Sequence, residues 1–216
     1  MDMARNLPVR GERHIDEVQI FPQRGFVYHI KGGGISGKLM RPFAELWAAL
    51  TLSQGEYVHW IDGASRFNPA RIMNNFPQHI PQPEQLLHGL FVGRGFTVHQ
   101  FSHLIERLSD EIKITKARLI VVDGPITMHL DSQVNDYEAR SLLRKSMNIL
   151  SQIAIDYQIP VVVITAVKGF SKRHASLLAL VANRSQNSLV GRYRRHMGKN
   201  KLWLTHLPSG SSGFRY

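Results

Sequence analysis

A glycine-rich segment carries the clearest chemical pattern in the chain. It reads Gly32-Gly33-Gly34-Ile35-Ser36-Gly37-Lys38-Leu39, with the P-loop spacing of a glycine, four residues, a glycine and a lysine. In a P-loop, backbone N–H groups and a helix N-terminus point at phosphates, and the lysine contacts their oxygens. Gly32, Gly37 and Lys38 are therefore candidate nucleotide-binding residues. A plain glycine-rich turn between a strand and a helix is the alternative interpretation.

A second pattern supplies a carboxylate for the same chemistry. Arg118-Leu119-Ile120-Val121-Val122-Asp123 has four aliphatic residues followed by an aspartate, the arrangement of a Walker B strand. Such a carboxylate reaches Mg²⁺ through water. Asp123 lies 85 residues after Lys38, which suits two intervening strand–helix units. Many buried strands end in aspartate, so Asp123 is a candidate only together with the glycine-rich segment.

The elements that must position these residues alternate along the chain. Apolar runs predict strands, and amphipathic periodicity predicts helices between them. Buried strands separated by helices indicate an α/β fold with a mostly parallel sheet covered on both faces, and short segments around Trp203 and Phe214 predict antiparallel edge strands. We expect one domain over residues 1–216, with residues 1–20 as an extension. The expected strands are Gly25–Lys31, Tyr57–Asp62, Gly95–His99, Leu119–Val122 and Val161–Thr165, and the clearest helices are His99–Ile112 and Glu138–Tyr157.

Positive charge is concentrated in the last third of the chain. The net charge is +11, and residues 157–216 hold ten Lys and Arg but no Asp or Glu. Clustered cations displace counterions from phosphates, so the pattern favours a nucleic acid partner over a basic surface with no partner. The candidate DNA-binding residues are Lys168, Lys172, Arg173, His174, Arg184, Arg192, Tyr193, Arg194, Arg195 and Lys199.

Other classes of protein and site are disfavoured by composition. The chain has no cysteine, which excludes disulfides and thiolate metal sites. Its longest apolar runs are too short to span a bilayer, and no signal peptide is evident, so we expect an intracellular protein with no membrane contact. The histidines have no metal-ligand spacing, and His99 and His103 are expected on the surface. No metal site and no Ser/His/Asp arrangement is predicted.

One longer segment resembles a known family. Ile61-Asp62-Gly63-Ala64-Ser65-Arg66-Phe67-Asn68-Pro69-Ala70-Arg71-Ile72 resembles a stretch of the ATPase core of RecA-type strand-exchange recombinases, especially archaeal RadA, its eukaryotic counterparts and their paralogs. Gly93-Arg94-Gly95-Phe96 and the strand Ile159–Thr165 also resemble family segments. The resemblance implies a RecA-like P-loop fold from about Gly25 onward. The family's N-terminal helical domain and its Phe-x-x-Ala motif are not recognisable here.

Three positions depart from what the resemblance implies for catalysis. Leu39 stands where the family has its Mg²⁺-binding threonine, Ala64 where it has a catalytic glutamate, and Val167 where it has a glutamine that senses the γ-phosphate. The sequence therefore predicts no catalytic residue and no required cofactor, while ATP binding stays possible. Of the two DNA-binding loops that the family implies, residues 124–136 contain no Lys or Arg, whereas residues 168–201 form a basic DNA-binding loop region.

The preferred interpretation is a recombinase paralog that binds single- or double-stranded DNA and assists recombination or repair without ATP hydrolysis. The resemblance implies a recombinase, another RecA-like paralog or a second copy as its protein partner. Two alternatives stay open. One is a DNA-stimulated ATPase with an atypical P-loop site, and the other is a protein-interaction scaffold in a recombination complex.

Overall fold

The computed structural model describes residues 14–15, 20–207 and 209–215, and these residues build one nine-stranded sheet. The strand order is β1-β9-β8-β7-β2-β6-β5-β3-β4. Strands β7, β2, β6, β5, β3 and β4 run parallel, and β8 is antiparallel to both of its neighbours. The predicted extension, residues 1–20, lies mostly outside the described residues. Its short strand β1 pairs with β9 in parallel.

The helices and strands follow the alternation that the sequence predicts. The strands are β1 His14–Ile15, β2 Val27–Gly32, β3 Val58–Asp62, β4 Leu90–Arg94, β5 Leu119–Asp123, β6 Val161–Ala166, β7 Asn187–His196, β8 Lys199–Leu207 and β9 Ser212–Arg215. The α-helices are α1 Arg41–Ser53, α2 Pro69–Met73, α3 Pro83–Leu86, α4 Val98–Thr115, α5 Asp136–Tyr157 and α6 Lys172–Ala182. Short 3₁₀ helices are η1 Ile35–Met40, η2 Leu87–Gly89 and η3 Thr127–Leu130.

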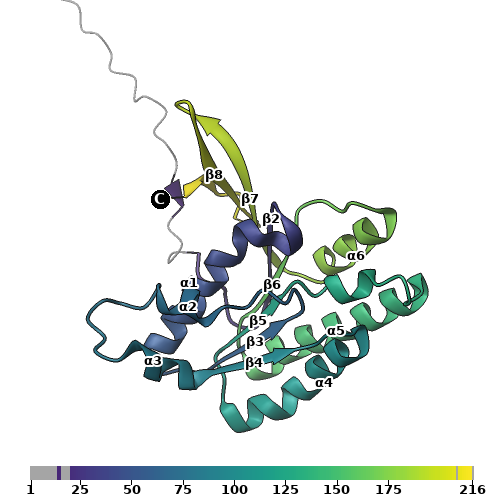
Figure 1. Ribbon diagram of the computed structural model, residues 1–216, viewed down its shortest axis with the longest axis horizontal. Helices are drawn as coiled ribbons and strands as arrows, with labels where there is room; N and C mark the ends of the chain where they lie inside the picture. The colour runs from purple at the N-terminus through teal and green to yellow at the C-terminus, as the bar shows by residue number, and fades with distance from the viewer. Residues whose placement is uncertain (1–13, 16–19, 208, 216) are drawn as a thin grey trace, which may run out of the picture.

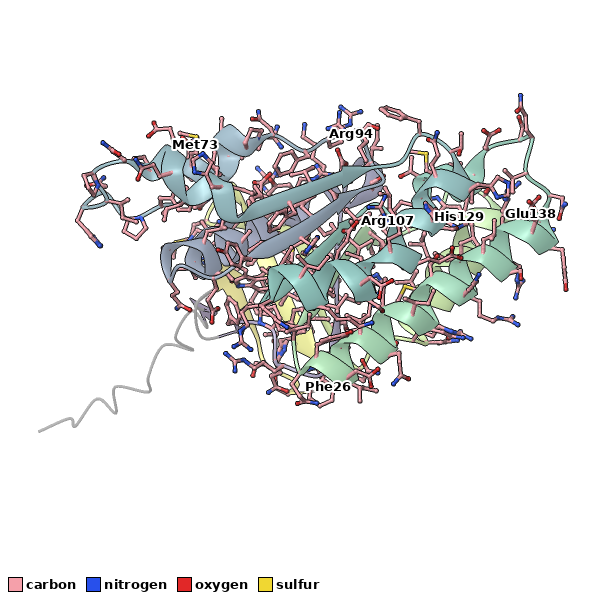
Figure 2. All side chains as sticks on the ribbon, turned by 90° about the horizontal axis from the view of Figure 1, so that it is seen from below. Phe26, Met73, Arg94, Arg107, His129 and Glu138 are labelled. Carbon is pink, nitrogen blue, oxygen red and sulfur yellow. The ribbon has the colours of Figure 1, made fainter. Side chains whose placement is uncertain are left out.

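The sheet separates two hydrophobic cores because successive strand side chains point to opposite faces. On β5, Leu119 and Val121 join the core under α1, whereas Ile120 and Val122 join the core under α4 and α5. Figure 1 shows α1 and α2 on one side of the sheet and α4, α5 and α6 on the other. Figure 2 shows α4 and α5 side by side along their face. The mostly parallel α/β fold with antiparallel C-terminal strands is therefore confirmed.

The strand register brings the chemical candidates to one edge of the sheet. Asp62 at the end of β3 is level with Asp123 at the end of β5, and Asp123 is level with Ile164 on β6. The glycine-rich segment follows β2, whose Gly32 is level with Ala166. Ligands of open α/β sheets bind outside the carboxyl ends of the strands, and all of these positions lie there.

Two local predictions were wrong. The strand expected at Gly95–His99 lies earlier, at β4, because Thr97 begins α4 by accepting a hydrogen bond from the Gln100 N–H at 3.2 Å. Residues 168–201 are not one loop. They form α6 and most of the β7–β8 hairpin, because Leu177, Leu180 and Val181 pack into the core.

None of the helices in the described part of the chain combines the length and apolar composition needed to cross a membrane.

The turn after β2 should be sensitive to a single methyl group. Gly37 has a φ of +79°, and a Cβ there would lie 2.2 Å from the Thr165 carbonyl oxygen on β6. We expect Gly37→Ala to lose about 1–2 kcal/mol of unfolding free energy to left-handed strain, plus about 1–3 kcal/mol to overpacking. The matched control is Gly55→Ala, because Gly55 has a φ of +75° with open space around it. Urea unfolding measures the loss of unfolding free energy in each variant. Equal losses in Gly37→Ala and Gly55→Ala would contradict the close packing of Gly37 against β6.

Candidate functional site

The glycine-rich turn is closed on itself. The Gly37 N–H donates to the Gly34 carbonyl at 3.3 Å, and the Leu39 N–H donates to the Gly33 carbonyl at 3.1 Å. These amides are among those that a P-loop directs at phosphates. The Ser36 hydroxyl forms a hydrogen bond with the Thr127 hydroxyl, with the two oxygens 2.9 Å apart. Lys38 is exposed and has no hydrogen-bond or ion-pair partner among the described residues.

A buried arginine holds the Walker B-like aspartate. Arg41 begins α1, and its Nε and Nη2 donate to the two carboxylate oxygens of Asp123, with Nη2 at 2.9 Å from Oδ1. Arg41 is 2% exposed and Asp123 is fully buried. Burial raises the pKa of the Asp123 carboxyl, and the guanidinium opposes that shift. The two parallel hydrogen bonds engage both oxygens of this carboxylate with a fixed cation.

Two further ion pairs lie beside this pair, and each joins a buried carboxylate to an exposed arginine. Glu45 lies one turn after Arg41 on α1, is 5% exposed, and has Oε1 3.7 Å from Nη1 of Arg71. Burial raises the pKa of Glu45, and Arg71 and Arg41 oppose the shift. Asp62 accepts from Arg94 at 2.8 Å and from the N–H groups of the turn after β3. Figure 2 labels Arg94 at the end of β4.

These residues do not fit the Mg²⁺ ion of a bound nucleotide. Leu39 has no oxygen ligand, and the carboxylate of Asp123 is engaged by Arg41. Ala64 lies against Gly124 and has no proton acceptor, and Val167 has no side-chain amide. Within the described residues, no group of three or more His, Cys, Asp or Glu side chains is placed to hold a metal ion.

The candidate DNA-binding residues fall into two groups, the first on or beside α6. Lys168 and Lys172 are exposed. Arg173 is 18% exposed with its Nε 3.3 Å from Oδ1 of Asp136, and His174 is 7% exposed. Arg184 donates to the Asn148 side chain at 3.0 Å. Only the two lysines therefore present unengaged charge here, and the DNA-binding role of the whole group stays a prediction.

The second group lies on the β7–β8 hairpin, which projects beyond the helical layers in Figure 1. Residues two apart on a strand share a face, and residues paired across strands do too. One face of the hairpin and of adjacent β2 therefore carries five cations, which we call the basic strip. The basic strip consists of Lys31, Arg192, Arg194, Lys199 and Lys201.

An aromatic ring lies within the basic strip. Trp203 is paired with Arg192, and the Arg194 guanidinium lies 4.5 Å from the centre of its ring. Burial and the charge of Arg192 lower the pKa of Lys31. A hollow of about 180 Å³ lies on this face. Its lining residues are Val190, Arg192, Arg194, Trp203 and Thr205. Cations interleaved with an aromatic side chain are the side-chain types that bind nucleic acid strands.

The hairpin also separates residues that the sequence grouped together. Tyr193 and Arg195 are exposed on the opposite face from Arg192 and Arg194. Sequence reasoning missed Lys31, Lys201 and Trp203 as members of the basic strip, and it missed Arg41. The alternation of Arg192 and Arg194 with Tyr193 was the signal for a strand. The expected surface positions of His99 and His103 are confirmed, and each lies beside a glutamate.

Removing the buried guanidinium should destabilise the fold in a pH-dependent way. Arg41→Met leaves the Asp123 carboxylate buried and unpaired, so we expect a loss of about 3–5 kcal/mol of unfolding free energy at pH 7.5. Without its cation, the carboxyl has a folded-state pKa further above the unfolded value of about 3.9. The loss is therefore full above the folded-state pKa and shrinks as the pH falls through it.

Urea unfolding at pH 7.5 and 5.5 measures this effect. The double variant Arg41→Met with Asp123→Asn removes both charges, so it should regain most of the stability and lose most of the pH dependence. A pH-independent loss below about 1 kcal/mol in the single variant would show that the pair is not a buried ion pair.

Two comparisons with known proteins were informative about the family of this chain. No curated protein matches the chain. The Rad51 family model matches residues 45–206, which include β3, β5, β6 and nearly all of the β7–β8 hairpin. That match covers well over half of the chain and agrees with the resemblance of the segment from Ile61 to Ile72. The chain therefore belongs to the Rad51 family, with a RecA-like recombinase core.

Proposed function

We propose that this protein is a DNA-binding recombination factor that does not depend on ATP hydrolysis. Membership of the Rad51 family supports a role in recombination or repair. The basic strip is the observation that carries DNA binding. It places five cations and Trp203 on one face, and all of them except Lys31 lie in residues 157–216, which contain no acidic residue. A strand of nucleic acid laid along this face meets cations spaced along two antiparallel strands.

The Arg41–Asp123 pair supports independence from ATP. A metal-bound nucleotide would require the carboxylate to exchange a buried guanidinium for the ion, and Arg41 would then be left as an unpaired buried cation. The positions of Leu39, Ala64 and Val167 offer no metal ligand, no proton acceptor and no γ-phosphate contact. We propose that the pair has replaced the nucleotide as the element that orders this edge of the sheet.

We further propose that the protein works beside a recombinase-like partner or a second copy of itself. Strand β4 is one edge of the sheet, and its Phe91 and Val92 are 38% and 43% exposed. A groove of about 450 Å³ between β4 and α4 is lined by Ile61, Leu104 and neighbouring residues. An exposed edge strand beside an apolar groove suits addition of a partner strand.

Neutralising the basic strip should weaken DNA binding by reducing its electrostatic component. For Arg192→Gln with Arg194→Gln we expect the slope of log affinity against log salt to fall by about two. The matched control is Arg140→Gln with Arg144→Gln, because both arginines are exposed on α5 and distant in sequence from the strip. Fluorescence anisotropy with single- and double-stranded DNA over a salt series measures the slopes. Equal slopes in the two variants would contradict the assignment of the strip.

Nucleotide should leave DNA binding unchanged. We expect the same affinity with and without ATP and Mg²⁺, because neither Lys38 nor Asp123 is part of the strip. The variant Lys38→Ala should behave like the unmodified protein, and phosphate release should not exceed that of this variant. Binding that appears only with ATP, or phosphate release that Lys38→Ala abolishes, would favour a DNA-stimulated ATPase instead. Failure to bind DNA in any condition would leave the scaffold interpretation.

A further inference from the structure

A pocket of about 580 Å³ lies at the carboxyl edge of the sheet, outside the basic strip. Three segments form its walls: the glycine-rich turn, the η3 segment after β5, and the chain between β6 and α6. Its volume is that of a small-molecule site. The walls are mostly apolar, with Ile35, Ile126, Leu130, Ala166 and Phe170 among the lining residues. Such walls suit a flat apolar group better than a phosphate.

The pocket presents an aromatic face to solvent. Phe170 is 79% exposed, and its ring is held edge-on against the His174 ring with centres 4.6 Å apart. Ile35, another lining residue, is 71% exposed. Every nucleobase has a π-face, and stacking of a base on an aromatic side chain contributes about 1–3 kcal/mol.

A buried polar group of the pocket has an unused hydrogen-bond donor. His174 is 7% exposed and lines the pocket. Its Nδ1 accepts from the Phe170 N–H at 3.5 Å, which leaves the proton of the neutral ring on Nε2. Nε2 has no hydrogen-bond partner among the described residues. Burial lowers the pKa of His174, which favours the neutral ring. The ring nitrogens and carbonyl oxygens of bases are acceptors for such a donor.

Charge and position connect the pocket to the basic strip. Among the described lining residues, Lys168 is the one with a formal charge, and Lys172 is exposed one turn away. Thr165, which lines the pocket, is level with Lys31 of β2, and Lys31 is level with Val190 of β7. The strip therefore begins one strand away from the pocket, on the same face of the sheet.

We propose that this pocket receives a nucleobase of single-stranded DNA, turned out of the strand whose phosphates lie along the basic strip. The inference rests on the proposed DNA binding. Lys168 contacts the adjacent phosphate, the base stacks on Phe170, and the Nε2–H group of His174 donates to an acceptor on the base edge. The protein then binds single strands through their bases as well as their charge, and this distinguishes them from duplex DNA, whose bases are paired and stacked.

The test compares two labelled strands with the same number of phosphates, an oligothymidine and an abasic oligomer of equal length. In fluorescence anisotropy at moderate salt, we expect the unmodified protein to bind oligothymidine about tenfold more tightly. Phe170→Ala should lose most of this difference and keep its affinity for the abasic strand. Ala166→Leu narrows the pocket from another wall and should act in the same way. The matched control is Phe96→Ala, because Phe96 is 70% exposed but does not line the pocket.

The other possible outcomes contradict either the base pocket or the proposed DNA binding, and they can be told apart. Equal affinity for the two strands, with a steep salt slope for both, would overturn the base pocket and leave the proposed function intact. Loss of binding to both strands in the unmodified protein would overturn the proposed function itself. If Phe170→Ala keeps the preference for oligothymidine but changes the oligomeric state by light scattering, the pocket is a contact between copies of this chain and the base pocket is wrong.

Discussion

The buried pair of Arg41 and Asp123 is the interaction on which the carboxyl edge of this sheet depends. Both side chains are removed from water, so each requires the other to offset its desolvation. The pair links the start of α1 to the end of β5. The carboxylates of Glu45 and Asp62, each with its own arginine partner, lie near Arg41. In a nucleotide-binding member of this fold, a metal and phosphates would supply the charges that order this edge. Here the chain supplies both charges itself.

The glycine-rich turn beside this pair is closed by its own backbone hydrogen bonds. The amides of Gly37 and Leu39 are satisfied inside the turn, and Gly37 contacts β6 too closely for any side chain. The turn then serves as one wall of an apolar pocket. Ala64 and Val167, at the same edge, carry no proton acceptor and no side-chain amide.

The membership of the basic strip is set by the geometry of the strands rather than by the number of cations. Alternation on β7 directs Arg192 and Arg194 to one face and Tyr193 and Arg195 to the other. Pairing with β8 adds Lys199 and Lys201, and pairing with β2 adds Lys31. Arg173 and Arg184 carry the same charge but are engaged by Asp136 and Asn148. Strand pairing therefore decides which of the cations share one face.

The sequence by itself determined the alternation of strands and helices, the family resemblance and the basic character of the last third. Local periodicity and residue chemistry carry those features, because they depend on neighbours within a few positions. The strand at β4 was misplaced to Gly95–His99, a segment that contains Thr97, the residue that caps α4. Only the tertiary structure decided which cations share a face, because strand pairing joins Lys31 to residues more than 150 positions away. It alone brought Arg41 to Asp123, because a buried charge selects its partner by proximity in space, across 82 residues of chain.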